Sequence, residues 1–482
     1  MMRPNLVLFM PDQLRSDAIG CFGQSAAHTP NIDALAADGI RFPNAYANHP
    51  VCGPSRVSFM TGWYPHVHGH RTLTNLLQPE DPNLLRYLKD AGYTVAWAGL
   101  RGDTFAPGVT EESTNFAGFL SPMTHDINAY ERLDHPLSSA FYDGRRPDRS
   151  DGLPYLDFDE ASIRTVEEIL ADPPPEPWCM FVALIFPHVP FQVEDPWYSH
   201  HHPSEMPEPS GVSSTRKPGF QAELRKRQGY GSFTSSDWAE ISRTYYGMVS
   251  RVDHQLGRVR DAVDRAGATE RTGWVFFTDH GEYLGDHGLV EKWPSGLDDC
   301  LLRNPLIVSL PDGPKGETNQ SFVELVDVMP TLLDVAQTEA QHTHFGRSLL
   351  PLLQGDRATH RDVAFSEGGF SPTDSDLFED VMEGRYATKT SLQREQPKLV
   401  GKATSVRTSE WTYIHRQSES DELYNRASDP QEHHNVLDDN PNVVAEHRDL
   451  MLEWLVETSD VIRWEKDPRF TRITPGWRPE QP

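Results

Sequence analysis

Near its N-terminus the chain reads Cys52-Gly53-Pro54-Ser55-Arg56-Val57-Ser58-Phe59-Met60-Thr61-Gly62, and this segment constrains the structure more than any other. Pro54 suits the first turn of a helix, where its missing N–H costs nothing, and Gly62 suits the end of one. We therefore expect a short helix that begins at residue 52. The free N–H groups and the dipole at such a helix N-terminus favour an anionic ligand.

The segment from Cys52 to Arg56 resembles the signature of the type I sulfatases, members of the alkaline-phosphatase-like superfamily. In that family a formylglycine-generating enzyme recognises Cys-x-Pro-x-Arg and oxidises the cysteine to formylglycine. The resemblance implies that residue 52 is the nucleophile, because one hydroxyl of the hydrated aldehyde can attack sulfur and the other can later expel sulfate. A buried cysteine in a tight turn is the plainer interpretation, and the length of the match favours the catalytic one.

Two predicted strands end in polar motifs. Residues 5–10 and 274–278 are apolar runs typical of buried strands, and ligands of open α/β sheets bind beyond the carboxyl ends of the strands. The resemblance implies that the residues after these strands hold a divalent cation together with residue 52: Asp12, Gln13, Asp279 and His280. Calcium is the usual metal of the family, and Mn²⁺ or Mg²⁺ is the alternative.

Two further segments match the family in order along the chain. His188 lies in Phe186-Pro187-His188-Val189-Pro190, which resembles a Pro-His-x-Pro element, and Lys292 ends the segment that begins at His287. The resemblance implies that His188 holds or protonates the leaving oxygen, a role that suits a side chain titrating near neutrality. Lys292 then neutralises the sulfate oxygens, and Arg56 and the cation stabilise them during attack.

One expected element is altered. Where most sulfatases carry Gly-Lys-x-His after a strand, this chain carries Gly99-Leu100-Arg101-Gly102-Asp103. Arg101 can replace the charge of the lysine, but a guanidinium cannot replace a proton carrier. Arg101 is therefore a candidate catalytic residue, and Asp103 either acts as a base or orients Arg101.

Three functions fit these motifs, and the first, hydrolysis of a sulfate monoester, is the one that they favour. The second is hydrolysis of a phosphonate monoester or phosphodiester, because Gln13 in place of the commoner aspartate, with Asp279 and His280, also resembles the phosphonate-hydrolase and choline-sulfatase branches. The third is a non-catalytic binding protein on a sulfatase scaffold, which the altered segment after Gly99 suggests. The loops that set substrate specificity are not fixed by these motifs.

The pattern of elements predicts an α/β fold with a mixed, mostly parallel central sheet flanked by helices over residues 1–370. Residues 371–482 are expected to form a smaller antiparallel sheet with a helix, with strand-like runs near Tyr386, Ser405, 411–415 and 422–424. The helix candidates are 31–38, 83–90, 159–171, 238–266 and 443–458.

The segment 194–237 is rich in Pro, Ser, Gly and His and is predicted to be a long irregular insertion. It follows His188, so it either forms a wall of the substrate pocket or is simply solvated. Within it, His200-His201-His202 suggests a metal site, but an internal triplet in such a loop is more often exposed.

The net charge and the composition indicate which kinds of partner the protein can have. With 44 Lys and Arg against 71 Asp and Glu, the formal net charge is −27, which disfavours nucleic acid as a partner. The four cysteines show no paired spacing, the first strand follows the N-terminus directly, and no apolar stretch has the length of a membrane span. We expect a cytoplasmic protein that acts on a small sulfated sugar or an aryl or alkyl sulfate. A homo-oligomer is left open.

Overall fold

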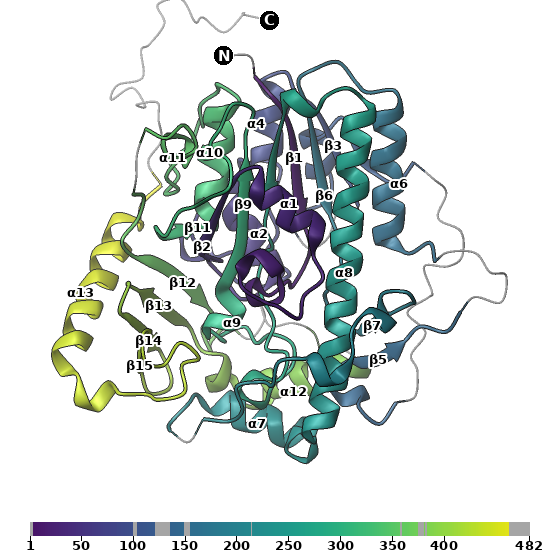
Figure 1. The fold of residues 1–482 in the computed structure, drawn as a ribbon. Coiled ribbons are helices and arrows are strands. Elements are labelled where there is room, and N and C mark those ends of the chain that lie inside the picture. The colour runs from purple at the N-terminus through teal and green to yellow at the C-terminus, as the bar shows by residue number, and fades with distance from the viewer. Residues whose placement is uncertain are drawn as a thin grey trace, which may run out of the picture.

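The computed structural model describes residues 3–99, 104–120, 135–148, 155–213, 215–356, 359–374, 380 and 383–461. Within these residues, a nine-stranded sheet lies between two layers of helices (Figure 1). Its order is β10-β2-β9-β8-β1-β6-β3-β4, and β11 also pairs with β2. The strands are β1 Asn5–Met10, β2 Ile40–Tyr46, β3 Thr94–Ala98, β4 Phe116–Gly118, β6 Trp178–Ala183, β8 Thr272–Phe276, β9 Arg303–Ser309, β10 Glu317–Thr318 and β11 Val323–Glu324.

The pairing of the large sheet is mixed but mostly parallel, as expected. Strand β1 pairs in parallel with β6 and β8, and β3 pairs in parallel with β4 and β6. Strand β9 runs antiparallel to both neighbours, β2 and β8. Every residue of β1 and β6 is buried, which explains why these strands read as continuous apolar runs rather than as alternating ones.

Helices cover both faces of this sheet. Helices α1, α6 and α8 pack together on one face, and α2, α4 and α10 pack on the other (Figure 1). The predicted helices 31–38, 83–90, 159–171 and 238–266 correspond to α1, α4, α6 and α8, within a few residues. The helices of the α/β part are α1 Pro30–Ala37, α2 Cys52–Thr61, α3 Pro65–His68, α4 Leu84–Asp90, α5 Val109–Ser113, α6 Phe158–Ala171, α7 Gly219–Gln228, α8 Ser235–Arg265, α9 Asp299–Leu302, α10 Val328–Val335 and α11 Leu350–Leu353.

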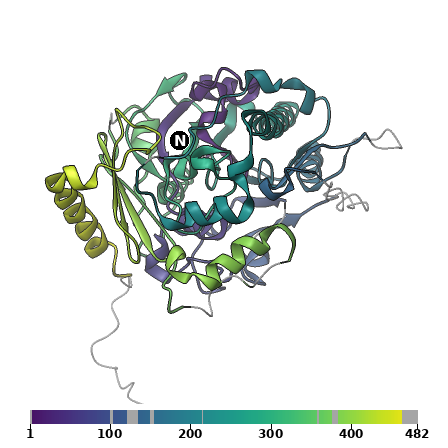
Figure 2. The ribbon, with the colours of Figure 1, turned by 90° about the horizontal axis from the view of Figure 1, so that it is seen from below.

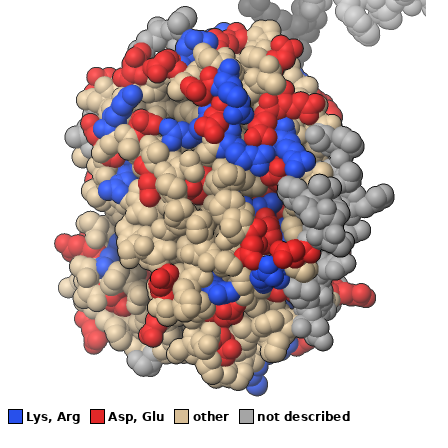
Figure 3. Space-filling view, turned by 45° about the vertical axis from the view of Figure 1, so that its right-hand side comes forward, with Lys and Arg blue, Asp and Glu red and all other residues tan. Residues whose placement is uncertain are grey.

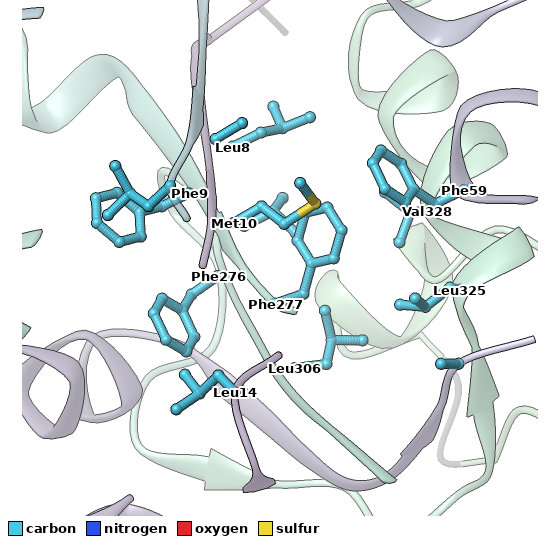
Figure 4. Close-up of a cluster of buried hydrophobic side chains, with 14 of the residues drawn as sticks. Leu8, Phe9, Met10, Leu14, Phe59, Phe276, Phe277, Leu306, Leu325 and Val328 are labelled. Carbon is cyan, nitrogen blue, oxygen red and sulfur yellow. The ribbon is translucent and has the colours of Figure 1, made fainter. Parts of the chain in front are cut away.

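The core divides at the sheet because alternate side chains of a strand point to opposite faces. Figure 4 shows Met10 and Phe277 directed toward Phe59 of α2, and Phe9 and Phe276 directed the other way. The ring of Phe59 meets that of Phe277 edge-on, with 5.0 Å between centroids, and the rings of Phe9 and Phe276 stack at 6.0 Å. These contacts hold α2, which begins at Cys52, against the sheet.

A smaller antiparallel sheet follows, with strands β12 Ala364–Gly368, β13 Ala403–Arg407, β14 Trp411–Arg416 and β15 Glu422–Asn425. Helix α13, Pro441–Glu457, packs on it through Trp454, which stacks on Phe365 of β12 at 4.8 Å (Figure 1). The first strand of this sheet, β12, ends at Gly368. The small sheet therefore begins before residue 371, where the sequence placed the start of the C-terminal part. The strand expected near Tyr386 is wrong, because Tyr386 ends a 3-10 turn that leads into helix α12, Ala387–Glu395.

The segment 194–237 is more regular than expected. It contains helix α7 and several 3-10 turns, and the short strands β5 Tyr142–Arg145 and β7 Phe191–Val193 form a separate two-stranded sheet just before it. Helices α7 and α12 lie at the lower end of the molecule in Figure 1, the end that faces the viewer in Figure 2. His201 is buried and lies 2.8 Å from Ser250 Oγ of α8, so the expectation that the whole histidine triplet is exposed is wrong.

The face seen in Figure 3 carries Lys and Arg interleaved with Asp and Glu. Where α6 and α8 adjoin, Arg258 pairs with both Glu160 and Glu167. Charge on such a surface is compensated locally, pair by pair. No helix among the described residues is both long and apolar enough to cross a bilayer.

Candidate active site

Three neighbouring strands deliver the candidate residues to one edge of the sheet. Strand β1 lies between β8 and β6, with Phe9 opposite Phe276 and Met10 opposite Ala183. The chain continues from β1 to Asp12, from β8 to Asp279 and from β6 to His188. Because these strands are parallel, their carboxyl ends meet, and the motifs converge as the sequence predicts.

Asp12, Asp279 and His280 form a buried cluster in which one ligand atom of each lies within 4.8 Å of the others. His280 Nδ1 lies 2.8 Å from the carbonyl oxygen of Gly281, and its Nε2 is buried without a hydrogen-bond partner, 3.6 Å from Asp12 Oδ1. Burial lowers the pKa of His280 to about 4, which keeps the imidazole neutral at neutral pH. Two carboxylates and an orphaned, neutral imidazole nitrogen fit a divalent cation.

Gln13 lies beside this cluster in a left-handed backbone conformation, with φ 65°. Tyr245 of α8 donates a 2.8 Å hydrogen bond to the carbonyl oxygen of Gln13, which supports that conformation from the helix layer. The Gln13 side chain donates to Glu282 and accepts a 2.8 Å hydrogen bond from Lys292. Its amide oxygen thus faces the lysine at the edge of the metal cluster, and its role as a metal ligand stays a prediction.

Helix α2 begins at Cys52 and ends at Thr61, and Gly62 caps its C-terminus with φ 70°, as predicted. All ten of its residues are buried, and Cys52 opens the first turn. Four positions along the helix, Arg56 donates to Asp279 Oδ2 at 2.9 Å and to Asp12 Oδ2 at 2.5 Å. Arg56 therefore ties the helix that carries residue 52 to two of the three members of the metal cluster.

Lys292 and His188 meet on the other side of the site. Lys292 Nζ donates to His188 Nε2 at 2.8 Å, and His188 Nδ1 lies 2.6 Å from the Val189 carbonyl oxygen. Burial and the charge of Lys292 place the pKa of His188 well below its ordinary value. The sequence suggested that His188 titrates near neutrality, and this prediction is wrong. Burial alone would lower the pKa of Lys292, but residue 52 and nearby acidic groups raise it. Lys292 is thus a cation close to the nucleophile position.

The sequence model of the family described as Sulfatase matches residues 4–338 of this chain. The chain belongs to the sulfatase family. This sulfatase is 28% identical to the uncharacterized sulfatase YidJ of Escherichia coli (strain K12), over 97% of this chain and 92% of that protein. It is 24% identical to an N-acetylglucosamine-6-O-sulfatase of Bacteroides thetaiotaomicron, over 90% of this chain and 83% of that one.

The chain is also similar to a solved structure. The phosphonate monoester hydrolase of Agrobacterium radiobacter superposes with a TM-score of 0.75 and 25% identity, and the alignment covers 96% of this sulfatase and 97% of that enzyme. The alignment spans both sheets, so the alkaline-phosphatase-like fold expected from the sequence is confirmed. The protein is an enzyme of the sulfatase family.

The sequence did not reveal what the C-terminal part of this sulfatase contributes to the site. Lys389 of α12 is buried, contacts the Glu291 carboxylate and donates to the carbonyl oxygen of Lys292. Just before it, the ring of Tyr386 packs on Phe141, with 5.0 Å between centroids. Burial lowers the pKa of Lys389 to about 7, and Glu282 and residue 52 oppose that shift. No local motif marks Lys389, which joins the site only through tertiary contact.

One candidate has no structural account. Arg101, with the neighbouring Asp103, lies outside the described residues of this sulfatase. The preceding strand β3 does lie in the large sheet next to β6. The role of Arg101 therefore stays a prediction.

Proposed function

We propose that this protein hydrolyses the sulfate monoester of a small substrate, either a sulfated sugar or an aryl or alkyl sulfate. The observation that carries the proposal is the meeting of three groups: Cys52 at the first turn of a buried helix, the Asp12–Asp279–His280 cluster, and the cation of Lys292. A helix N-terminus, a metal site and a lysine each favour an anion, and together they suit a sulfate group. The sulfatase relatives support the same substrate class.

The proposed reaction needs a modified residue and a metal ion. Residue 52 is converted to formylglycine by a formylglycine-generating enzyme, and the hydrated aldehyde supplies an attacking hydroxyl and a second hydroxyl that can expel sulfate. Asp12, Asp279 and His280, with Gln13 and residue 52, would hold a divalent cation, which supplies positive charge for the sulfate oxygens. Calcium is proposed first and Mn²⁺ or Mg²⁺ second, because the donors are mostly oxygens with one imidazole.

The remaining steps fall to the side chains of the chain itself. Arg56 holds Asp12 and Asp279 in place and adds a fixed positive charge beside residue 52. Lys292 binds the oxygens of the transferred group and, as the protonated member of its contact with His188, can donate a proton to the leaving oxygen. His188 enters neutral, with Nε2 as an acceptor, and orients the Lys292 ammonium. A cytoplasmic location is part of the proposal, supported by four cysteines that form no disulfide.

A second candidate is hydrolysis of a phosphonate monoester or phosphodiester on the same site. It is favoured by Gln13 and His280 at the metal cluster, which leave fewer negative ligands than a set of carboxylates would, and by the similarity to the Agrobacterium radiobacter enzyme over nearly the whole chain. Both reactions need the same nucleophile and the same cation. They differ in the atom that is attacked, sulfur or phosphorus, and in the group that is bound, because a sulfate monoester presents three non-bridging oxygens and a phosphonate monoester or phosphodiester presents two.

Steady-state hydrolysis of an aryl sulfate against a matched aryl phosphonate tests the proposal, with protein matured to formylglycine and Cys52→Ala as the blank. A higher kcat/KM for the sulfate supports a sulfatase reaction, and a higher kcat/KM for the phosphonate supports the second candidate. Full activity in folded Cys52→Ala would end both. Intact mass before and after maturation identifies the exchange of the thiol for an aldehyde at residue 52.

A further inference from the structure

One buried carboxylate lies between two lysines at the edge of the candidate active site. Glu291 Oε1 lies 2.9 Å from Nζ of Lys292, and its Oε2 contacts Nζ of Lys389. The side chain of Glu291 is 1% exposed, and each lysine side chain is 8% exposed. Lys292 adjoins Glu291 in sequence, but Lys389 comes from α12, about a hundred positions further along the chain.

The backbone fixes the carboxylate in this place. Glu291 adopts φ 67°, and its N–H donates to Glu282 Oε1 at 2.5 Å. The N–H of Lys292 donates to Glu291 Oε2 at 2.7 Å, and Lys389 also donates to the carbonyl oxygen of Lys292. Buried charges are costly unless they are paired and hydrogen-bonded. Lys389 therefore pairs with the buried charge of Glu291 and also fixes the backbone of Lys292 through its carbonyl oxygen.

The same ammonium of Lys292 faces the reaction. It donates to His188 Nε2 and to Gln13 Oε1, each at 2.8 Å. Glu291 thus competes with these groups, and with any bound anion, for one cation. A second lysine on the carboxylate weakens that competition whenever Lys389 is protonated, a form that its contact with Glu291 favours, because Glu291 then divides its charge between two ammonium groups.

We propose that Lys389 is a positioning residue of the active site: by sharing the Glu291 carboxylate, it leaves the Lys292 ammonium directed at His188, Gln13 and the bound anion. The proposal rests on the function proposed above in one respect, that Lys292 binds the transferred group. Lys389 itself does not contact the substrate. It acts on the position of the Lys292 ammonium through Glu291.

The test compares Lys389→Gln, which removes the charge but keeps a donor, with Lys389→Arg, which keeps the charge. The measurements on matured protein are kcat/KM for the aryl sulfate and the aryl phosphonate, and the Kd of inorganic phosphate by calorimetry. We expect Lys389→Gln to lower kcat/KM roughly 10- to 100-fold and to weaken phosphate binding, because misplacing a catalytic cation slightly has effects of this size. Lys389→Arg should retain most of both. If Lys389→Gln does not fold, Lys389→Met is the second neutral variant.

Two controls separate positioning from structure. Lys217 is a matched lysine whose side chain is 6% exposed and pairs with Asp298, so Lys217→Met should lower Tm without changing either measurement on the folded protein. In a Glu291→Gln background, Lys389→Gln should cost little, because no carboxylate then draws Lys292 away. Equal losses in Lys217→Met and Lys389→Gln, or the same loss from Lys389→Gln with and without Glu291, overturn the proposal.

Phosphate binding reports on Lys389 even if the protein hydrolyses neither ester. A matured wild type that binds phosphate but hydrolyses neither ester contradicts the proposed function, and the effect of Lys389→Gln on the phosphate Kd still decides the role of Lys389. Indistinguishable phosphate binding by wild type and Lys389→Gln overturns the inference, including the case in which neither protein binds phosphate.

Discussion

Nζ of Lys292 donates a 2.8 Å hydrogen bond to Nε2 of His188. The imidazole proton therefore lies on Nδ1, where it can donate to the Val189 carbonyl oxygen, and the ring is neutral. Of the two side chains, Lys292 carries the positive charge. After the nucleophile, Lys292 is therefore the residue whose replacement should lower kcat/KM most.

Lys292→Met should lower kcat/KM for the better of the two aryl esters by roughly 10²- to 10³-fold, the usual cost of removing one group that stabilises developing oxyanion charge. The reason is that methionine fills the same space but gives the transferred group no cation. Steady-state kinetics on matured protein measures the effect. Lys315→Met changes an exposed lysine and should behave as wild type; comparable losses in both variants would contradict the role of Lys292.

A divalent cation should raise Tm through the Asp12–Asp279–His280 cluster. A ligand that binds only the folded state adds roughly 2.7 kcal/mol to the free energy of unfolding when its concentration is about 100 times its Kd. Thermal unfolding in chelator, then with Ca²⁺, Mn²⁺ or Mg²⁺, measures the shift and ranks the metals. His280→Ala should abolish the shift, whereas His415→Ala, a half-exposed histidine of β14, should leave it intact. An unchanged shift in His280→Ala would place the cation elsewhere.

Glu367 of β12 should make the free energy of unfolding depend on acid pH. Burial would raise the pKa of its carboxyl, but Arg71 and His66 outweigh burial and lower the pKa from 4.5 to about 2. Because the folded pKa lies below the unfolded one, the stabilisation is complete above about pH 4.5 and is lost as the pH falls toward 2. At about 1.4 kcal/mol per pKa unit, the contribution is at most roughly 3 kcal/mol.

Denaturant titrations at several pH values between about 2 and 7 measure this contribution, because that range covers both the folded and the unfolded pKa of Glu367. Glu367→Gln should be less stable than wild type near pH 7, and the difference should shrink toward pH 2. Glu446→Gln, which changes an exposed glutamate of α13, serves as the control. A difference for Glu367→Gln that is constant across the range would contradict the ionic origin.

Phe59→Ala should lower the free energy of unfolding by about 3–5 kcal/mol, the usual cost of truncating a buried aromatic ring. Phe59 is fully buried and meets Phe277 and Phe181 edge-on. Urea unfolding of the purified variant measures the loss. Leu452→Ala, which changes a leucine that is 61% exposed, should cost far less. Since Phe59 lies on α2, activity should fall along with stability in Phe59→Ala.

Much of the catalytic half could be predicted from local patterns. The apolar runs at 5–10 and 274–278 identified two buried strands of the large sheet, β1 and β8, and Pro54 with Gly62 identified the ends of α2. Motifs that follow parallel strands meet at one edge of the sheet, so the convergence of Asp12, Asp279 and His188 was predictable as well. Polar residues in the segment 194–237, by contrast, concealed α7, because that helix carries few apolar residues and is held by its neighbours.

Short motifs and the period of apolar side chains were enough to predict the family, the α/β class and the candidate site residues. How these residues interact depends on tertiary contacts. The tertiary structure set His188 as a neutral acceptor of Lys292, since burial controls its pKa, and it brought Lys389 to Glu291. Contacts between segments a hundred residues apart depend on packing and on the loss of water around charges, neither of which a local pattern records.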